Sequence, residues 1–439
     1  MNVSAIKKMN EIIPYWIKRP FSEAIRSKLI GNRRFLDQYL LLCEADQWSK
    51  ERKQQFQQHE LYRMLKYAND HSMYYQKLFE NNNIELNGKN DQERLARIPA
   101  LSKKTLQTHL EEISVNGLKD FYTVTTGGTT GQPTTVYMEK DAIYREWAFV
   151  YHFWSKFGYD YKTSKLVTLR GVDLGNKVFE INPLYREVRL NTFRMNKENI
   201  SDYVKAADAY GADFIYGYPS SVYNFFRLCE LNDISVKGKY KAALLISENL
   251  YSFQEELIKR VGGCPVAIFY GHSERAVFAE RYEYGYVLNP LYGYTEFNDK
   301  GNPIVTGFIN RKTPLIKYEV DDEFIPKNNG FYDIVGHRDC EVLYGVNGEQ
   351  ISMAAVNVHD DTFENIESYQ FYQDTPGKCA LYVTCSTELP DSRIIKIENS
   401  VNHKLAGAVN CTVKQTDKIL YTERGKYKMV IQKLSGGVS

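Results

Sequence analysis

The chain has 439 residues, of which 43% are hydrophobic and 25% are charged. This length can bury a large core without disulfide or metal staples, and the composition is that of a globular protein, which excludes the disordered and fibrous classes. Lysine and arginine number 56 against 54 aspartates and glutamates, so the formal net charge of +2 provides no global attraction to nucleic acid.

The first sixty residues are predicted to form a basic, helical extension. Residues 1–34 contain eight lysines and arginines against two glutamates, with Trp16, Ile17 and Phe21 among them. Two interpretations stay open: the segment docks on an anionic membrane or on a glycan-assembly complex, or it is a solvated arm packed against the main domain. We find no apolar run long enough for a signal peptide or a membrane-spanning helix. We therefore expect a cytoplasmic protein, either free or peripheral to the inner face of the membrane.

The remaining elements follow in chain order. Apolar residues recur at helical spacing over 35–80, and from Tyr122 onward short β-rich runs alternate with helical stretches, which favours an α/β sheet domain. Residues 286–345 are rich in strands and turns and predict an antiparallel or mixed β region. The last hundred residues carry a small α+β pattern, with two strands and a helix near 380–384, 410–414 and 391–405.

The number and spacing of cysteine and histidine residues argue against disulfide bonds and against a structural zinc site. The seven cysteines are odd in number and no pair has CxxC spacing, so we expect free thiols in a reducing compartment. The eight histidines lack paired-ligand spacing, and a structural zinc site is therefore not expected.

The segment TTGGTTGQPT at residues 125–134 contains three glycines and five threonines. Glycine lets the backbone approach phosphate oxygens closely, and threonine hydroxyls add hydrogen-bond donors. The segment is not a Walker loop, because GK[ST] is absent. A tight hairpin turn favours the same residues, so composition alone leaves phosphate binding and an ordinary turn equally open.

The order of residues in this loop resembles the SSGTTGKPT loop of adenylate-forming enzymes, which activate a carboxylate with ATP and release pyrophosphate. Further segments resemble motifs of that superfamily in the same order: YGHSE at 270–274, TPLIKY at 313–318 followed by Asp322, IVGHRD at 334–339, and RGK at 424–426. Within the superfamily, three stretches resemble the phenylacetate–CoA ligase group and its CapK-like proteins of capsular polysaccharide biosynthesis, at 214–225, 270–275 and 342–352. The resemblance covers roughly residues 60–435.

The resemblance implies an α/β architecture with two domains behind the extension. A large N-terminal adenylation domain with mixed sheets and helices would span 61–338, and a small mobile C-terminal α+β domain would span 339–439, after an extension at 1–60. The active site would lie in the cleft between the domains, and rotation of the small domain would alternate between adenylation and acyl transfer.

The resemblance also implies roles for individual residues. ATP would be bound by the glycine- and threonine-rich loop and by residues of the later motifs, namely Thr126, Gly127, Gly128, Thr129, Thr130, Gly131, Ser247, Glu248, Tyr270, Gly271, Ser273 and Asp322. Asp322 would accept hydrogen bonds from the ribose hydroxyls, and Glu274 would carry Mg²⁺, a hard cation that takes carboxylate oxygen.

The catalytic candidates implied in the same way are Lys426, Arg338 and His272. Lys426 would stabilise the negative charge that develops as the carboxylate attacks the α-phosphorus. For His272 two interpretations stay open, contact with the acid or acceptor and a packed, neutral side chain. The acyl pocket would lie near Tyr216, Tyr218 and Ser220, whose polar and aromatic character favours a polar acid.

Three positions depart from the family pattern. Gln132 replaces the usual lysine, Asp321 replaces glycine, and His337 aligns with the arginine of the GR pair. The expected function is ATP- and Mg²⁺-dependent adenylation of a carboxylic acid and transfer of the acyl group to a thiol, amine or hydroxyl, in surface polysaccharide biosynthesis. CoA is one candidate acceptor. The departures keep an alternative open, a catalytically weak nucleotide-binding scaffold of a glycan assembly complex.

Overall fold

The structure is a computed structural model that describes residues 21–22, 24–28, 30–88, 91–126, 134–172, 174–248, 250, 252–299, 301–335, 342–356, 363, 366, 368–385, 387–417, 420 and 429–434. No helix in these ranges combines the length and hydropathy needed to cross a membrane.

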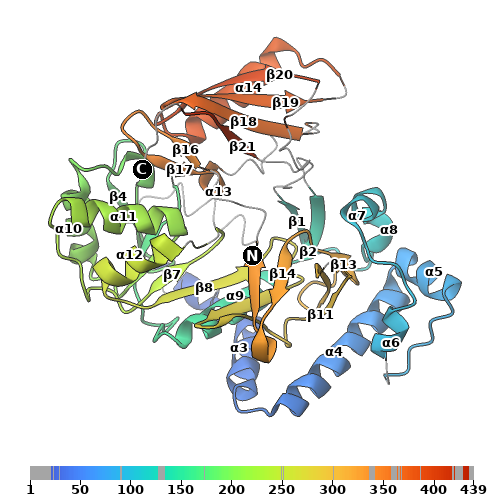
Figure 1. The fold of residues 1–439 in the computed structure, drawn as a ribbon. Helices are drawn as coiled ribbons and strands as arrows, with labels where there is room; N and C mark the ends of the chain where they lie inside the picture. Colours follow the sequence, from blue (N-terminus) through green and yellow to red (C-terminus); the bar gives the residue numbers. More distant parts are fainter. Residues whose placement is uncertain are drawn as a thin grey trace.

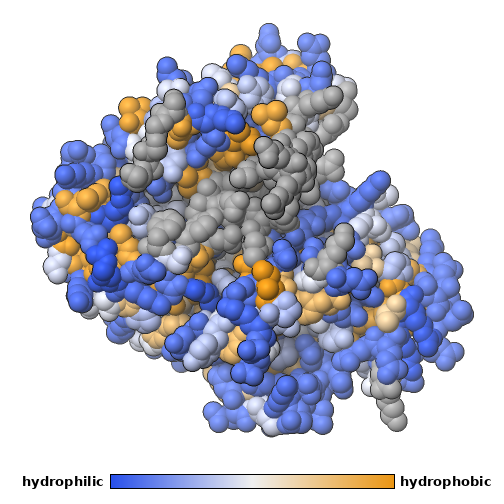
Figure 2. Space-filling view, viewed as in Figure 1, coloured by the Kyte–Doolittle hydropathy of each residue, from blue (hydrophilic) through white to orange (hydrophobic). Residues whose placement is uncertain are grey.

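A run of helices precedes the first strand (Figure 1): α3 (Arg33–Ala45), α4 (Lys50–His71), α5 (Met73–Asn81), α6 (Asp91–Leu95), α7 (Lys103–Thr108) and α8 (Leu110–Ile113). The helical prediction for 35–80 is confirmed, but as three helices. Side chains of Asn32, Ser49 and Ser72 accept hydrogen bonds from backbone N–H groups three residues later, which explains why the helices begin where they do. Hydrophilic residues cover most of the visible face over α4–α6 (Figure 2).

The largest sheet has ten strands in the order β14-β15-β10-β9-β8-β7-β6-β3-β5-β4. Its strands are β3 (Leu166–Leu169), β4 (Phe179–Asn182), β5 (Glu187–Leu190), β6 (Phe214–Gly217), β7 (Ala243–Leu245), β8 (Val266–Gly271), β9 (Phe278–Tyr282), β10 (Gly285–Leu288), β14 (Glu323–Pro326) and β15 (Tyr332–Val335). The pairs β5–β3, β3–β6, β6–β7 and β7–β8 are parallel, whereas β8–β9 and the strands beyond it are antiparallel. The predicted α/β sheet is therefore confirmed.

Helices cover both faces of the parallel strands. On one face α3 and α9 (Ala142–Ser155) pack against residues such as Phe214 and Leu244. On the other, α10 (Ile200–Tyr210), α11 (Pro219–Leu231) and α12 (Ser252–Gly262) pack against residues such as Ile215 and Leu245. Burial on both faces explains why these strands read as continuous apolar runs.

Two smaller sheets complete the large domain. The hairpin β1 (Phe121–Thr126) and β2 (Thr134–Glu139) pairs Thr126 with Thr134, and β11 (Gly293–Phe297), β12 (Pro303–Gly307) and β13 (Tyr318–Glu319) form a three-stranded sheet. Helices α4–α8 share one hydrophobic cluster with both sheets. Short 3₁₀ turns lie at η1 (Thr192–Arg194) and η2 (Asn328–Gly330).

The C-terminal part forms a separate small layer, at the top of Figure 1. Its sheet has the order β20-β19-β18-β21, and α14 (Asp391–Lys404) packs on it through Ile397 and Val401. The remaining elements are β16 (Val342–Tyr344), β17 (Gln350–Ser352), α13 (Met353–Val356), β18 (Ser368–Thr375), β19 (Lys378–Thr384), β20 (Asn410–Gln415) and β21 (Val430–Gln432). The predicted α+β pattern is confirmed. The boundary predicted at 338–339 lies outside the described residues and stays a prediction.

Candidate active site

Several of the predicted site residues that the structure describes lie at one edge of the main sheet. Strands β3, β6, β7 and β8 run parallel, so the segments that follow them lie at the same edge. These segments contain Arg170, Tyr218, the pair Ser247 and Glu248, and the motif at 271–275. Ligands of open α/β sheets bind outside the carboxyl ends of such strands. The candidate site is therefore this carboxyl edge.

Tyr270 and Asp322 are in direct contact although 52 residues separate them. The Tyr270 hydroxyl at the end of β8 donates to Asp322 Oδ2 over 2.6 Å. Burial and the nearby Asp322 carboxylate raise the pKa of Tyr270, so its hydroxyl stays protonated and remains a donor. The structure thus brings together two residues that were assigned separately to nucleotide binding.

Glu274 is a buried carboxylate, with 6% of its surface exposed. The Tyr318 hydroxyl donates to its Oε1 over 3.1 Å, and His272 Nδ1 lies 3.1 Å from its Oε2. Burial by itself would raise the pKa of Glu274, but the His272 ring and the backbone N–H of Glu274 outweigh burial and lower the pKa to about 2. The group is therefore a carboxylate at neutral pH.

A single carboxylate fits one kind of metal site. In the part of the chain that the structure describes, no group of three His, Cys, Asp or Glu side chains could hold a metal ion by itself. Mg²⁺ commonly binds through one or two carboxylates together with substrate phosphates and water. The charged Glu274 fits this pattern and does not fit an all-protein cage.

His272 has a polar ring without a well-formed hydrogen bond. Only 17% of its side chain is exposed, and neither ring nitrogen makes a hydrogen bond within the described ranges. Its contact with Glu274 has ion-pair distance but not hydrogen-bond geometry. Because buried polar atoms are rarely left unpaired, His272 is suited to bind a ligand at this edge.

Asp321, one of the three departures, forms an ion pair with Lys103 at the start of α7. The same lysine acts electrostatically on Glu274. The carboxylate that replaces glycine at this position therefore ties the helical layer to the strand region that carries Asp322. This contact is structural and gives no sign of a lost active site.

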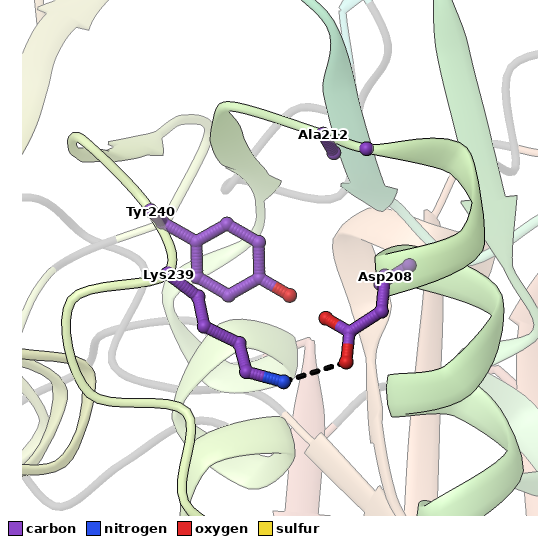
Figure 3. A pocket seen from close by; sticks show the side chains of 6 residues that line it. Asp208, Ala212, Lys239 and Tyr240 are labelled. Atoms are coloured by element: carbon purple, nitrogen blue, oxygen red, sulfur yellow. Dashed lines mark hydrogen bonds and ion pairs between the residues drawn. The ribbon is translucent and has the colours of Figure 1, made fainter.

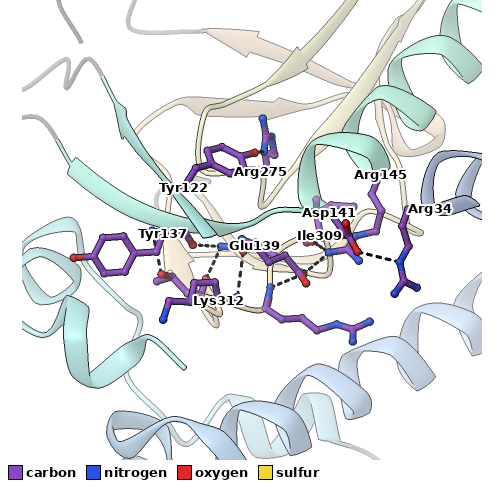
Figure 4. A network of polar contacts seen from close by, with 12 residues as sticks. Arg34, Tyr122, Tyr137, Glu139, Asp141, Arg145, Arg275, Ile309 and Lys312 are labelled. Atoms are coloured by element: carbon purple, nitrogen blue, oxygen red, sulfur yellow. Dashed lines mark hydrogen bonds and ion pairs between the residues drawn. The ribbon is translucent and has the colours of Figure 1, made fainter. Parts of the chain in front are cut away.

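The loop that contains Arg275 is anchored to the hairpin of β1 and β2. Arg275 donates to the Tyr122 hydroxyl of β1, and its guanidinium carbon lies 5.8 Å from the centre of the Tyr122 ring (Figure 4). On β2, Glu139 pairs with Arg145 of α9 and accepts from the Arg311 backbone N–H over 3.0 Å. Arg275 was not predicted to be a positioning residue, because 153 residues separate it from Tyr122.

Three residues of these segments have a strained backbone. Ser247, Arg275 and Lys317 have φ values of 65°, 54° and 51°, in the left-handed region that residues with a Cβ rarely adopt. Such conformations cost on the order of 1–3 kcal/mol each. Other residues with a Cβ share this conformation elsewhere in the described chain, so backbone strain alone does not single out the site: Asn83, Arg186, Asp233, Asn329 and Ala406.

The structure describes some of the remaining predicted site residues and not others. Glu248 Oε2 accepts from the Ser220 backbone N–H over 3.1 Å at the start of α11, and Gly271 and Ser273 are exposed at the end of β8. Most of the glycine- and threonine-rich loop and the catalytic pair lie outside the described residues: Gly127, Gly128, Thr129, Thr130, Gly131, Gln132, His337, Arg338 and Lys426. Their roles stay predictions.

A pocket of about 290 Å³ lies elsewhere. Its lining residues include Asp208 and Ala212, just before β6, and Lys239 and Tyr240, just before β7 (Figure 3). Lys239 pairs with Asp208 over 2.6 Å. The pocket lies at the amino edge of the parallel strands, opposite the motifs, so it is separate from the candidate site.

Comparisons with known proteins agree with this geometry. No protein-family model matches the chain. The chain is similar to Protein CapK of Staphylococcus aureus, with 23% identity over 448 residues that cover 94% of this chain and 96% of CapK. It is also similar to the crystal structure of 2-hydroxyisobutyryl-CoA ligase with 2-HIB-AMP and CoA in the thioesterification state. That TM-score is 0.52, with 17% identity over 88% of this chain and 91% of the ligase. The two comparisons confirm the predicted fold and the predicted resemblance.

Proposed function

Since the chain is similar to Protein CapK over nearly its whole length and shares the fold of an acyl-CoA ligase, we propose that it belongs to the CapK-like branch of the adenylate-forming ligases and activates a carboxylic acid with ATP. The acid's oxygen attacks the α-phosphorus, the bond to the pyrophosphate breaks, and an acyl-adenylate forms. The acyl group then passes to a thiol, amine or hydroxyl, and AMP leaves. The observation that carries this proposal is the contact of Tyr270 with Asp322 beside the buried, charged Glu274.

The nucleotide would bind across the end of β8. The Tyr270 ring offers a flat apolar face to the adenine, while its hydroxyl holds Asp322 in place. A carboxylate has about four acceptor sites, so Asp322 can accept from Tyr270 and from ribose hydroxyls together. Binding ATP at this position would direct its phosphates toward the hairpin β1–β2, which the Arg275–Tyr122 contact fixes to the same loop.

Charge on the phosphates would be neutralised by a metal ion and by side chains of this chain. Glu274 would hold Mg²⁺, which when bound reduces the negative charge on the phosphate oxygens. His272 would donate a ring N–H to the reacting carboxylate or to the α-phosphate, which would satisfy its unpaired ring. Lys426 and Arg338 would complete the electrostatic stabilisation of the transition state.

The acceptor and the setting are finer parts of the proposal. CoA is supported as acceptor because the solved ligase with the same fold holds CoA together with an acyl-AMP. Surface polysaccharide assembly is supported by the similarity to CapK over nearly the whole chain. Such a role fits a cytoplasmic enzyme whose basic N-terminus contacts the inner face of the membrane or a glycan-assembly complex.

Exchange of radiolabelled pyrophosphate into ATP, measured over a panel of acids with and without Mg²⁺, tests the proposal. We expect exchange that depends on one class of acid and on Mg²⁺, and that Glu274→Gln reduces about 10²-fold or more. Glu296→Gln, which alters a partly buried carboxylate on β11 outside the site, is the matched control and should retain exchange. ATP binding without exchange for any acid would instead support the nucleotide-binding scaffold.

A further inference from the structure

Arg170 occupies the carboxyl edge of the sheet but belongs to none of the recognised motifs. It directly follows β3, and its side chain is exposed. Its Nη1 donates to the Tyr216 hydroxyl over 2.9 Å, and its guanidinium carbon lies 5.4 and 5.9 Å from the ring centres of Tyr216 and Tyr218. Two aromatic rings and one phenol therefore orient the guanidinium.

The backbone at this position is fixed by a close approach of two strands. A Cβ on Gly217, which lies between the two tyrosines, would stand 2.2 Å from the Leu169 carbonyl oxygen. Only glycine permits that spacing between β6 and the residue that precedes Arg170. The sheet therefore holds the backbone next to Arg170 in place, which limits the positions that the guanidinium can take.

The charge of Arg170 is not matched by a nearby carboxylate contact. Glu187 acts on it electrostatically, but the Glu187 carboxylate already accepts from Thr168 over 2.6 Å and from Asn182 over 2.7 Å, and it pairs with Arg189 over 2.8 Å. Throughout the described part of the chain no carboxylate lies at ion-pair distance from Arg170. Among the described residues, the exposed Arg170 guanidinium therefore has no carboxylate partner of its own.

Two buried polar atoms without a hydrogen bond lie on residues next to the two tyrosines. Trp154 Nε1 and Ser220 Oγ are buried and make no hydrogen bond within the described residues. The Trp154 ring lies 5.1 Å from the Tyr216 ring, and Ser220, the second residue of α11, follows Tyr218 by two positions. Buried donors without partners are costly, so a ligand with several oxygen atoms fits this position.

The distance between Arg170 and the reacting position sets the length of the acid that can reach both. Along the sheet order β8-β7-β6-β3, three strand spacings of about 4.8 Å separate β3 from the strand that leads to His272 and Glu274. The bond to Tyr216 draws the guanidinium toward β6, which leaves about two spacings, or roughly 10 Å. A short acid can therefore reach from the reacting position toward Arg170.

We propose that the acid activated by this enzyme carries a second anionic group, a carboxylate or a phosphate, and that Arg170 binds that group. The inference rests on the proposed function, because it names the substrate class of the same site. The planar guanidinium can grip a carboxylate or phosphate through two parallel hydrogen bonds. Trp154 and Ser220 donate to remaining oxygen atoms of the acid.

Matched pairs of acids test the inference in pyrophosphate exchange. The pairs are succinate with butyrate, glutarate with valerate, adipate with hexanoate, and 3-phosphoglycerate with glycerate, so that each pair differs at the second anionic group. We expect exchange with a dianionic member and little with its partner. Arg170→Gln should raise KM for the dianionic acid on the order of 10- to 100-fold with a much smaller change in kcat. The diacids test a carboxylate as the second anionic group, and 3-phosphoglycerate tests a phosphate.

A binding measurement separates this inference from the proposed function. Calorimetric titration of the same acids, in the presence of an ATP analogue that cannot be cleaved at the α-phosphorus, needs no turnover. If a dianionic acid binds to the wild type and Arg170→Gln abolishes that binding, the inference is supported even where exchange fails. Failure of exchange with binding intact would refute only the proposed adenylation. Arg170→Lys keeps the positive charge but cannot form two parallel hydrogen bonds with one anionic group. It should therefore bind the dianionic acid with an affinity between those of the wild type and Arg170→Gln.

Arg260→Gln, which alters a surface arginine on α12 paired with Glu230, is the control and should change neither readout. Equal exchange or binding with the neutral and dianionic members of every pair overturns the inference. So does unchanged behaviour of a folded Arg170→Gln variant, or a rise in KM for CoA alone, since Arg170 would then bind the acceptor's phosphates.

Discussion

Replacing Glu274 with glutamine keeps the shape of the side chain and removes its charge, in a position that is 6% exposed. Although burial opposes the charged form, the His272 ring and the backbone N–H bring the pKa of Glu274 from an ordinary value of 4.5 to about 2. This difference corresponds to about 3 kcal/mol of folding free energy at neutral pH. We therefore expect Glu274→Gln to lower the free energy of unfolding by about 2–4 kcal/mol.

The pH dependence of this loss has a definite sign. Because the folded pKa of Glu274 lies below the unfolded value, its stabilisation is fully present above pH 4.5 and is lost as the pH falls through about 2. The gap between wild type and Glu274→Gln should therefore be constant near pH 7 and narrow in acid. Urea unfolding in Mg²⁺-free buffer at several pH values measures it.

Glu296→Gln provides a control of opposite sign. Burial raises the pKa of Glu296 and Lys317 only partly offsets this, so the charged form of Glu296 is disfavoured in the folded state. Its replacement should leave the free energy of unfolding at pH 7 unchanged or raise it. Equal losses for both variants, or a loss below about 0.5 kcal/mol for Glu274→Gln, would refute the assignment of Glu274 as a buried carboxylate whose charged form the His272 ring favours.

Two further predictions concern residues of the site, and a third concerns the cysteines. Lys426→Ala should slow adenylation by about 10²–10³-fold but leave acyl transfer from a premade acyl-adenylate intact, because Lys426 would act only in the first half-reaction; equal loss in both halves would contradict domain rotation. Tyr270→Phe should raise KM for ATP about tenfold, since a hydrogen bond to a charged group is lost, and steady-state kinetics with unchanged KM would speak against a role of the Tyr270–Asp322 contact in nucleotide binding. Thiol titration of freshly prepared, denatured, non-reduced protein should find all seven cysteines free, and a markedly lower count would exclude the reducing compartment.

Local sequence patterns predicted the elements and the order of the motifs. The β-rich runs at 165–169 and 242–246 predicted strands, which the structure has at β3 and β7. The loop at 125–134 predicted a hairpin or a phosphate loop, because glycine and threonine have distinct local preferences. The helix predicted near 391–405 matches α14 within one residue at its end. Such features depend on neighbours in sequence, which is why a single sequence reveals them.

Contacts between distant segments could not be predicted in the same way. Lys103 and Asp321 are 218 residues apart, so Asp321 was only a departure from the family glycine until the fold brought α7 beside it. His272 was left undecided because its unpaired ring depends on which side chains surround it in space. Arg170 left one local signal, its position directly after a short buried strand, but its aromatic partners come from β6 and the start of α11.

The central claim, that a carboxylate of the substrate attacks the α-phosphorus of ATP, has a direct isotopic test. The acid that gives the fastest exchange is labelled with heavy oxygen in its carboxylate, and AMP is collected after full turnover with acceptor and analysed by mass spectrometry. Adenylation transfers one carboxylate oxygen to phosphorus, so the account predicts AMP that carries one heavy oxygen. Unlabelled AMP, or ADP as the nucleotide product, would contradict it.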